Sequence, residues 1–239
     1  MRCVILAAGD GSRLAPLTLQ HPKPLLHVLG RPLIDYTLET LVAVGICDLI
    51  LVVGYQQEQI RDWVGDGHRY GARVNYVPNP NFELENAQSL YAARHAVADL
   101  PFMLTMADHM ISKDIVHMLL TRRLQTDTLC VDRRASSAPQ LSDATRVWVN
   151  SHGHIRQIGK GLAHWNAVDT GVFLFTSAVF DAMDALRAQG KFNLNLSQSV
   201  TWLIERGNGL QACDVSGAWW TDVDTLEDLQ NVEAELNRR

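Results

Sequence analysis

An uninterrupted apolar segment followed at once by a loop of small residues opens the chain, and this order constrains the fold more than any other feature. Residues 4–7 are apolar without alternation, which is typical of a strand buried on both faces of a parallel sheet. The loop residues Ala8, Gly9, Gly11 and Ser12 lack bulk, so their backbone N–H groups can approach an anion closely. The sequence therefore predicts an α/β protein with an anion site after its first strand.

Two cationic side chains follow this loop. Arg13 offers a planar fork for phosphate oxygens, and Lys23 adds a compact point charge. Pro22 and Pro24 fix φ on both sides of Lys23, so the lysine lies on a stiff segment. The set suits a polyphosphate, but it is neither a Walker A loop nor a Gly-x-Gly-x-x-Gly dinucleotide fingerprint. The alternative is a buried strand followed by an ordinary glycine-rich loop.

Composition excludes several classes of protein. Of the 239 residues, 47% are hydrophobic and 20% charged, which is ordinary for a globular protein, and the net charge of −5 argues against a nucleic-acid partner. No stretch approaches the roughly 20 apolar residues of a membrane span, so we expect no membrane insertion. The four scattered cysteines lack CxxC spacing, and three of them lie in apolar, strand-like contexts, which predicts buried free thiols and a reducing cytoplasm.

Strand and helix signals alternate through the first half of the chain. This alternation predicts right-handed βαβ units and a mostly parallel sheet covered on both sides. Ligands bind such sheets at the carboxyl ends of strands, beside a topological switch point. We expect strands at 2–7, 48–53, 72–77 and 101–106, and helices at 32–44, 56–64, 87–98 and 112–122.

The second half begins with strand signals instead. Residues 151–153 form an expected hairpin turn, Thr225 an expected helix cap, and 133–143 a polar segment expected to be a mobile loop. No linker separates independent units, so a single domain is expected. The expected strands are 128–131, 145–150, 154–158, 168–175 and 210–215, and the expected helices are 177–188, 196–206 and 225–237.

Three carboxylates predict a site for a divalent cation. Asp108 ends an apolar strand and should point into the crevice, where it can bind a hard cation; the alternative is a cap for the helix near 112. Asp222 and Asp224 are two residues apart in an extended segment, so both can face the same way. A cation would relieve their repulsion, although capping is an alternative for Asp224.

Lys160 and Asp169 are candidates for the second substrate. Lys160 lies between two glycines after a strand, where there is room for a phosphate, although a solvated loop lysine is the alternative. Asp169 begins a strand and can accept hydrogen bonds from substrate hydroxyls.

These residues carry a family resemblance. Leu6-Ala7-Ala8-Gly9-x-Gly11-x-Arg13-Leu14 with Pro22-Lys23-Pro24 resembles the signature of nucleotidyltransferases that make NDP-sugars and CDP-alcohols, and Asp108, Lys160 and Asp222 follow in the family's order. The resemblance implies a three-layer, Rossmann-like (GT-A-type) fold with a mixed, mostly parallel central sheet. It also implies that 1–125 form a nucleotide-binding half and 126–239 an acceptor-binding half of the single domain 1–239.

Finer features are similar to one branch of that family. Residues 85–91, Glu-Asn-Ala-Gln-Ser-Leu-Tyr, replace the usual Gly-Thr-Ala of NDP-sugar pyrophosphorylases and look more like cytidylyltransferases. Residues 106–109, Met-Ala-Asp-His, are similar to the Met-Gly-Asp-His of inositol-1-phosphate cytidylyltransferases, with Ala107 in place of glycine. Many such relatives are fused to a membrane CDP-alcohol phosphotransferase domain that this sequence does not contain. Segments 132–133, 143–145, 158–160, 168–171 and 220–225 share the similarity.

The resemblance implies a Mg²⁺-dependent enzyme that transfers CMP from CTP to a small phosphorylated alcohol, with inositol-1-phosphate as the first choice, and releases pyrophosphate. The alternatives are a sugar-1-phosphate nucleotidyltransferase using UTP, GTP or dTTP, and a phosphocholine or phosphonate cytidylyltransferase. A regulatory subunit that only binds nucleotides is the non-enzymatic alternative. The oligomeric state stays open, a homodimer included.

The resemblance also implies a role for each site residue. Arg13 and the amides of Gly9, Gly11 and Ser12 would hold the β- and γ-phosphates, and Lys23 would neutralise charge at the α-phosphate. The metal ligands would be Asp108, Asp222 and Asp224. The base would be read near Leu6, Ala7, Ala8, Tyr55, Asn86, Gln88 and Ser89, and the acceptor by Asp132, Lys160, Asp169, Thr170 and Gly171.

Overall fold

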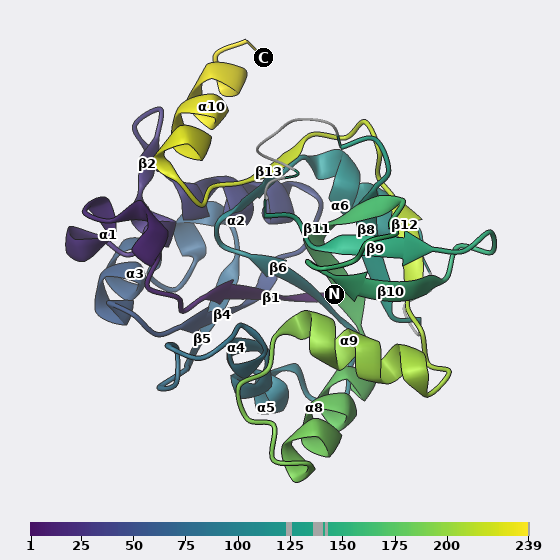
Figure 1. The fold of residues 1–239 in the computed structure, drawn as a ribbon. Coiled ribbons are helices and arrows are strands. Elements are labelled where there is room, and N and C mark those ends of the chain that lie inside the picture. Colours follow the sequence, from purple (N-terminus) through teal and green to yellow (C-terminus); the bar gives the residue numbers. More distant parts are fainter. Residues whose placement is uncertain (123–125, 136–140, 142, 239) are drawn as a thin grey trace.

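A nine-stranded mixed sheet forms the centre of the protein (Figure 1). The computed structural model describes residues 1–122, 126–135, 141 and 143–238. The strands are β1 (Arg2–Ala7), β2 (His27–Val28), β3 (Arg31–Pro32), β4 (Asp48–Val53), β5 (Arg73–Pro78), β6 (Phe102–Met106), β7 (His109–Ile111), β8 (Thr128–Asp132), β9 (Arg146–Val149), β10 (Ile155–Gly159), β11 (Ala167–Phe175), β12 (Gln211–Asp214) and β13 (Trp220–Asp222).

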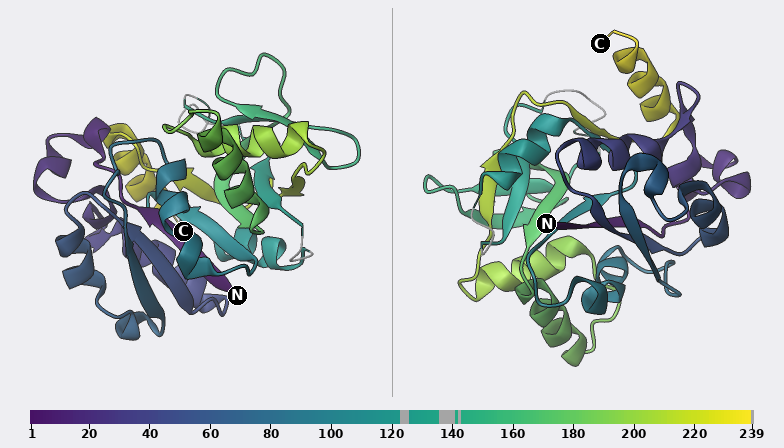
Figure 2. Two further views of the ribbon diagram at one scale, coloured as in Figure 1. Left: turned by 90° about the horizontal axis from the view of Figure 1, so that it is seen from below. Right: turned by 180° about the vertical axis from the view of Figure 1, so that it is seen from behind.

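Helices lie on both sides of this sheet, which confirms the predicted three-layer α/β fold. They gather below and above it in Figure 1, with α10 standing at the rim beside β2 in Figure 2 as well. The helices are α1 (Leu17–Gln20), α2 (Leu33–Ala43), α3 (Gln57–Val64), α4 (Ala87–Ala92), α5 (Arg94–Val97), α6 (Lys113–Leu120), α8 (Ala178–Ala188), α9 (Leu196–Glu205) and α10 (Leu226–Leu236), with 3₁₀ turns η1 (Ser12–Leu14), η2 (Lys23–Leu25) and η3 (His68–Tyr70).

The order of the strands puts a switch point beside β1. The main path runs β10-β9-β11-β6-β1-β4-β5, with β8 joining β11 to β12. The chain leaves β1 for β4 on one side and later returns to β6 on the other, and all three strands are parallel. Since carboxyl ends of parallel strands share one edge, the loops after β1, β4 and β6 meet there. The two halves of the chain share this sheet, because β11 pairs with β6.

The central strand is buried on both faces, as its continuous apolar run predicts. Val4 and Leu6 pack into one core with α4, α5, α8 and α9, whereas Cys3, Ile5 and Ala7 pack into the other with α2, α3 and α6. Alternate side chains of a strand point to opposite faces, so the five residues 3–7 supply apolar partners to both cores. This double burial fixes where β1 ends and where the glycine loop begins.

A third, smaller core ties the C-terminal helix to the N-terminal loop. Leu14 after the glycine loop and Val223 before α10 are both fully buried there, together with Val232 of α10. Thr225 caps α10, as predicted, and forms a reciprocal capping box with Asp228. The C-terminal segment is thereby held against the loop that the sequence singled out for anion binding.

Most predicted elements lie within one or two residues of the observed ones, and two differences matter. The helix predicted at 87–98 is broken at Ala93 into α4 and α5, where Ala93 N–H bonds three residues back to Leu90. The β7–β13 ladder was not predicted, and it places Asp222 directly opposite His109. Residues 136–140 and 142 of the predicted mobile loop lie outside the described residues.

Two expectations from composition can be compared with the fold. The four cysteines are free, and Cys3, Cys130 and Cys213 are buried while Cys47 is exposed. Within the described ranges, no helix has the length and apolar character needed to cross a membrane.

We expect Leu104→Ala to lower the free energy of unfolding by about 2–5 kcal/mol, because Leu104 of β6 is fully buried against β1 and β11. Urea unfolding followed by circular dichroism measures the change. Leu19→Ala is the control, since Leu19 is 68% exposed, and its effect should stay within about 0.5 kcal/mol. Equal losses in both variants would show that this core assignment is wrong.

Candidate active site

Two adjoining cavities open at the carboxyl edge of β1 and β6. Their volumes are about 650 and 550 Å³, and Gly9, Arg13, Asn86, Asp108 and Asp224 line both. The first continues to β10, β11 and α9, whereas the second continues along the glycine loop. Together they form one crevice large enough for a nucleotide and a second small molecule.

The glycine loop is held tightly against Lys23. Gly11 has φ +64°, and a Cβ there would come within 2.8 Å of the Lys23 Cβ and 2.9 Å of a Thr18 methyl. Thr18 also donates its hydroxyl to the Gly11 carbonyl at 3.1 Å. Only glycine meets both demands, a left-handed backbone and no side chain. The glycine loop therefore packs closely against the segment that carries Lys23.

The buried ammonium of Lys23 joins the two ends of the chain. Lys23 is 8% exposed, and its Nζ donates to Asp108 Oδ2 at 2.6 Å and to Asp224 Oδ1 at 2.5 Å. Burial alone would lower the pKa of Lys23, but the two carboxylates outweigh burial and raise it. Burial likewise opposes ionisation of Asp108, yet Lys23 and His109 hold its pKa well below the ordinary range. Lys23 and Asp108 are thus both charged at neutral pH.

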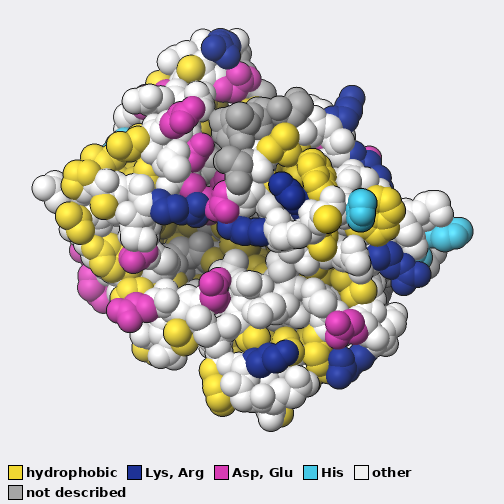
Figure 3. Space-filling view, in the orientation of Figure 1, with side chains coloured by type: hydrophobic (Ala, Val, Ile, Leu, Met, Phe, Trp, Pro, Cys, Tyr) yellow, Lys and Arg dark blue, Asp and Glu magenta, His cyan; other side chains and the backbone are white. Residues whose placement is uncertain are grey.

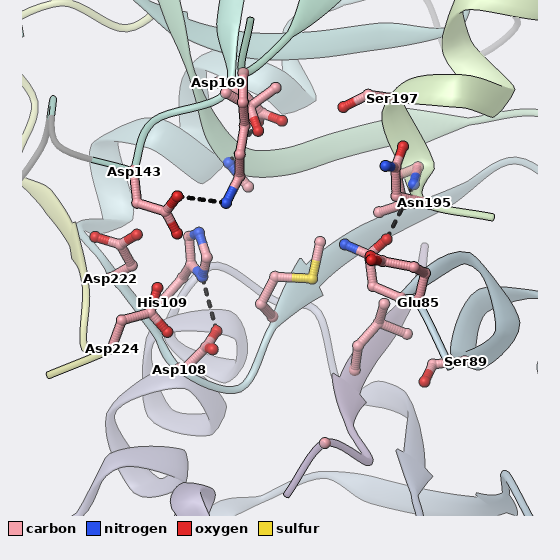
Figure 4. A pocket seen from close by; sticks show the side chains of 18 of the residues that line it. Glu85, Ser89, Asp108, His109, Asp143, Asp169, Asn195, Ser197, Asp222 and Asp224 are labelled. Carbon is pink, nitrogen blue, oxygen red and sulfur yellow. Dashed lines mark hydrogen bonds and ion pairs between the residues drawn. The ribbon is translucent and has the colours of Figure 1, made fainter. Parts of the chain in front are cut away.

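These contacts decide between the alternatives for the two aspartates. Asp108 does not cap the helix near 112, because its carboxylate bonds Lys23 and His109 while Ser112 holds the N-cap position of α6. Asp224 does not cap α10 either, because Thr225 does. Both carboxylates line the crevice (Figure 4).

His109 is a site residue that sequence reasoning named only as part of a motif. Its Nδ1 lies 2.8 Å from Asp108 Oδ1, and its ring lines the larger cavity. A Cβ on Gly171 would collide with the ring, so the glycine, with φ +74°, makes room for it. Burial opposes the charged form, but Asp108 raises the pKa of His109 to about 9, which keeps the imidazole protonated. A cation thus lies between the Asp108 carboxylate and β11.

A second group of ion pairs crosses the mouth of the crevice. Asp143 Oδ2 accepts from Arg13 Nη1 at 2.8 Å, and Asp143 Oδ1 accepts from Lys160 Nζ at 2.6 Å. Arg13 Nη2 lies 2.8 Å from Asp224 Oδ2. Acids and bases therefore alternate in a chain that runs Lys160, Asp143, Arg13, Asp224, Lys23, Asp108, His109. Figure 3 shows basic and acidic side chains side by side across the hollowed middle of this face.

Asp222 and Asp169 face the crevice outside this chain of ion pairs. Burial raises the pKa of Asp222, with added repulsion from Asp224 and Asp108, and no Lys or Arg among the described residues forms an ion pair with it. Burial also raises the pKa of Asp169 to about 6, although the Gly171 N–H donates to its carboxylate at 2.7 Å. Both carboxylates are costly to ionise without a ligand.

Lys23 lies within the predicted metal site of Asp108, Asp222 and Asp224, which stays a prediction. Across the described residues, no three His, Cys, Asp or Glu side chains converge to hold an ion. The reason is Lys23, whose ammonium lies between Asp108 and Asp224 and neutralises both. The protonated His109 opposite Asp222 only partly offsets the burial and the neighbouring acids that raise the pKa of Asp222.

Four predicted binding residues lie away from the crevice. The Tyr55 hydroxyl donates to Thr18 O, and its ring packs on Phe82, which lines both cavities in its place. The Gln88 side-chain amide donates a hydrogen bond to the Phe192 carbonyl and accepts one from the Arg187 guanidinium. The remaining two are Asp132, whose carboxylate accepts from Trp220 Nε1 at 3.0 Å, and Thr170, whose hydroxyl donates to Cys130 O at 2.9 Å. Their polar groups are used within the fold.

The other predicted residues line one or both cavities, as Figure 4 shows for the labelled ones. Across the larger cavity from the acids, the N-terminus of α9 contributes residues that the sequence did not indicate. Asn86 joins this wall to the 82–89 segment, since its side chain accepts from Leu196 N–H at 3.0 Å. The predicted lining residues are Leu6, Ala7, Ala8, Gly9, Gly11, Ser12, Arg13, Lys23, Asn86, Ser89, Asp108, Lys160, Asp169, Gly171, Asp222 and Asp224, and the additional ones include Phe82, Glu85, His109, Asp143, Asn195, Ser197 and Thr201.

Comparison with known proteins agrees with this arrangement. The model of the family described as nucleotidyl transferase matches residues 2–239. The chain belongs to this family. It is therefore an enzyme of the nucleotidyl transferase family.

Three relatives of this nucleotidyl transferase are informative. A bifunctional IPC transferase and DIPP synthase of Aquifex aeolicus is 35% identical over 235 residues, which are 98% of this chain and 51% of that protein. A glucose-1-phosphate thymidylyltransferase of Streptomyces griseus is 28% identical over 97% of this chain and 65% of its own length. The solved inositol-1-phosphate CTP transferase from T. maritima superposes with a TM-score of 0.87 at 25% identity, covering 99% of this chain and 95% of that one.

The raised pKa of Asp169 predicts a pH-dependent stability. A carboxyl with a folded pKa of about 6 and an unfolded pKa of about 3.9 stabilises the fold most below pH 4, and this contribution is lost as pH rises to 6. Asp169→Asn cannot ionise but still accepts from Gly171 N–H. The free energy of unfolding of the variant, relative to that of wild type, should therefore rise by about 1–2 kcal/mol from pH 4 to pH 7. The partial exposure of Asp169 makes this rise smaller than the full effect of the pKa shift.

Urea unfolding at pH 4, 5.5 and 7 checks this expectation. Asp62→Asn on the exposed side of α3 is the control. A stability difference between Asp169→Asn and wild type that stays constant over this range would contradict it.

Proposed function

We propose that this nucleotidyl transferase moves CMP from CTP to a phosphorylated alcohol, with inositol-1-phosphate as the first candidate, and releases pyrophosphate. The observation that carries the proposal is the buried Lys23, held between Asp108 and Asp224 where β1 and β6 end. The switch point is where the phosphate under attack would lie, and a fixed positive charge there would neutralise the charge on that phosphate. The similarity to the Aquifex aeolicus and T. maritima proteins supports the choice of substrates.

The reaction needs no protein nucleophile. A phosphate oxygen of the acceptor attacks the α-phosphorus of CTP in line, the bond to the bridging oxygen of the β-phosphate breaks, and pyrophosphate leaves. Catalysis then consists of positioning and charge neutralisation. Arg13 and the amides around Gly9 and Gly11 would hold the β- and γ-phosphates, and Lys23 would stabilise charge on the α-phosphate.

A magnesium ion would complete this arrangement. Asp108 and Asp222 would hold it, with substrate phosphates as further ligands, and the ion would neutralise phosphate charge. The support is Asp222, a carboxylate that burial and neighbouring acids make costly to ionise. Asp224 is assigned to Lys23 and Arg13 in this scheme.

The acceptor would lie in the part of the larger cavity between β10, β11 and α9. Lys160 would bind its phosphate, and Asp169 would accept hydrogen bonds from its hydroxyls. Ser197 and Thr201, one turn apart on α9, present hydroxyl groups from the opposite wall. The base of the nucleotide would lie near Leu6, Ala8 and Ser89.

A sugar-1-phosphate nucleotidyltransferase is the second candidate. The thymidylyltransferase of Streptomyces griseus is 28% identical over nearly the whole chain, and a sugar has the same hydroxyl-rich chemistry as inositol. A regulatory subunit without activity is disfavoured, because Arg13, Lys23, Asp108 and Asp222 all line the crevice.

Pyrophosphate release with a panel of substrates decides between these candidates. The panel pairs CTP, UTP, GTP and dTTP with inositol-1-phosphate, phosphocholine, 2-aminoethylphosphonate and glucose-1-phosphate, in the presence and absence of Mg²⁺. We expect turnover with CTP and inositol-1-phosphate and its loss when Mg²⁺ is chelated. Turnover with UTP and glucose-1-phosphate but none with CTP would refute the cytidylyl assignment.

Lys23→Met tests the proposed centre. The variant keeps the apolar stem but loses the charge, and we expect kcat to fall by about 10²–10³-fold. The loss also leaves Asp108 and Asp224 without their buried cation, so the melting temperature should fall as well. Lys191→Met, at an exposed position, is the matched control. Full kcat in Lys23→Met would exclude the lysine from the chemistry.

A further inference from the structure

We propose that the Asp143 carboxylate holds the place of a substrate phosphoryl group between Arg13 and Lys160, and that substrate displaces it. Asp143 is in this view a positioning residue that keeps the two cations together before phosphate arrives. The inference rests on the proposed function, since it takes Arg13 and Lys160 to be the cations that bind the phosphates.

The first support is the geometry of the three side chains. Asp143 uses one oxygen for Arg13 Nη1, at 2.8 Å, and the other for Lys160 Nζ, at 2.6 Å. A phosphoryl group offers the same arrangement, namely neighbouring anionic oxygens that can each accept from a different cation. Arg13 follows β1 and Lys160 follows β10, so the Asp143 carboxylate links two segments of the crevice that are far apart in the sequence.

The second support is the balance of charge. Within the described residues, Lys160 forms its ion pair with Asp143 alone, whereas Arg13 is also paired with Asp224. Lys160 and Arg13 hold the pKa of Asp143 below its ordinary value although partial burial opposes them, so the carboxylate is charged. A substrate phosphate entering the crevice would meet this negative charge beside the cation that binds it, Arg13 for the nucleotide and Lys160 for the acceptor.

The third support is that Asp143 is the acid most easily released from the chain of ion pairs. Its side chain is 44% exposed, and its partners Arg13 and Lys160 are 55% and 62% exposed. Asp224 is only 17% exposed and is also held by the buried Lys23. Exposed ion pairs contribute little to stability, so substrate can replace Asp143 at low cost while Asp224 stays in place.

Binding of inorganic pyrophosphate to the full chain, in metal-free buffer at low salt, tests the proposal by calorimetry. Asp143→Asn keeps the size of the side chain but removes its charge, and we expect pyrophosphate to bind about two- to tenfold more tightly than to wild type. Asp143→Glu restores the charge and should return the affinity to near the wild-type value. The gain should shrink as salt is raised, since all three partners are partly exposed.

Glu39→Gln is the matched control. Glu39 forms an exposed ion pair with Arg31 away from the crevice, so removing its charge should leave the affinity unchanged. In turnover assays, Asp143→Asn should lower the KM for the phosphorylated acceptor more than it changes kcat. Equal or weaker pyrophosphate binding by Asp143→Asn, or no binding by either protein, would overturn the proposal.

The result of this binding experiment can be distinguished from the result of the substrate panel that tests the proposed function. Pyrophosphate binding does not depend on which base or acceptor the enzyme uses. Tighter binding by Asp143→Asn together with no turnover of CTP would support the role of Asp143 and refute the cytidylyl assignment. Turnover of CTP with unchanged pyrophosphate affinity would do the reverse.

Discussion

A single buried ammonium group holds the centre of this protein together. Lys23 ties Asp108, at the end of a central strand, to Asp224, which lies 201 residues further along the chain than Lys23. Burying one unpaired charge is expensive, and removing one partner of a buried pair typically costs about 3–5 kcal/mol. The glycine loop, the end of β6 and the C-terminal segment must therefore reach this point together. The same charge lies where the phosphates of a nucleotide would bind in the proposed reaction. Both the fold and the proposed chemistry therefore require a positive charge at this residue.

Much of the fold could be predicted because its signals are local. Residues 4–7 of β1 are all apolar, so neither face of this part of the strand favours exposure to water, and burial on both sides could be predicted. Gly11 and the prolines around Lys23 likewise act through their own backbone preferences. The contacts of the acidic side chains were harder to predict. Asp108 could be placed at the edge of the sheet because a strand ends there, but no local pattern shows that the Lys23 ammonium would lie between Asp108 and Asp224.

The rest of the site depends on contacts between distant segments. The β7–β13 ladder is three residues long, and its strands are more than a hundred residues apart, so its effect on His109 and Asp222 has no sequence signal. Gln88 and Thr170 were assigned to substrate by their position in a motif, yet neighbouring helices and strands use their polar groups. Asp143 was part of a recognisable segment, but its place between Arg13 and Lys160 appears only when β1 and β10 are brought together. A motif thus locates a region of the site more reliably than it assigns single side chains.

The small core around Leu14, Val223 and Val232 has a consequence for how the protein is made. It joins the first loop of the chain to the last helix, and the acid that neutralises Lys23 lies on the same C-terminal segment. On the ribosome, the sheet of β1, β4, β5 and β6 can form while the final residues are still in the exit tunnel, but Lys23 then lacks Asp224. A polypeptide cut short before β13 would carry the glycine loop but would lack the Asp224 carboxylate that pairs with Lys23 and Arg13.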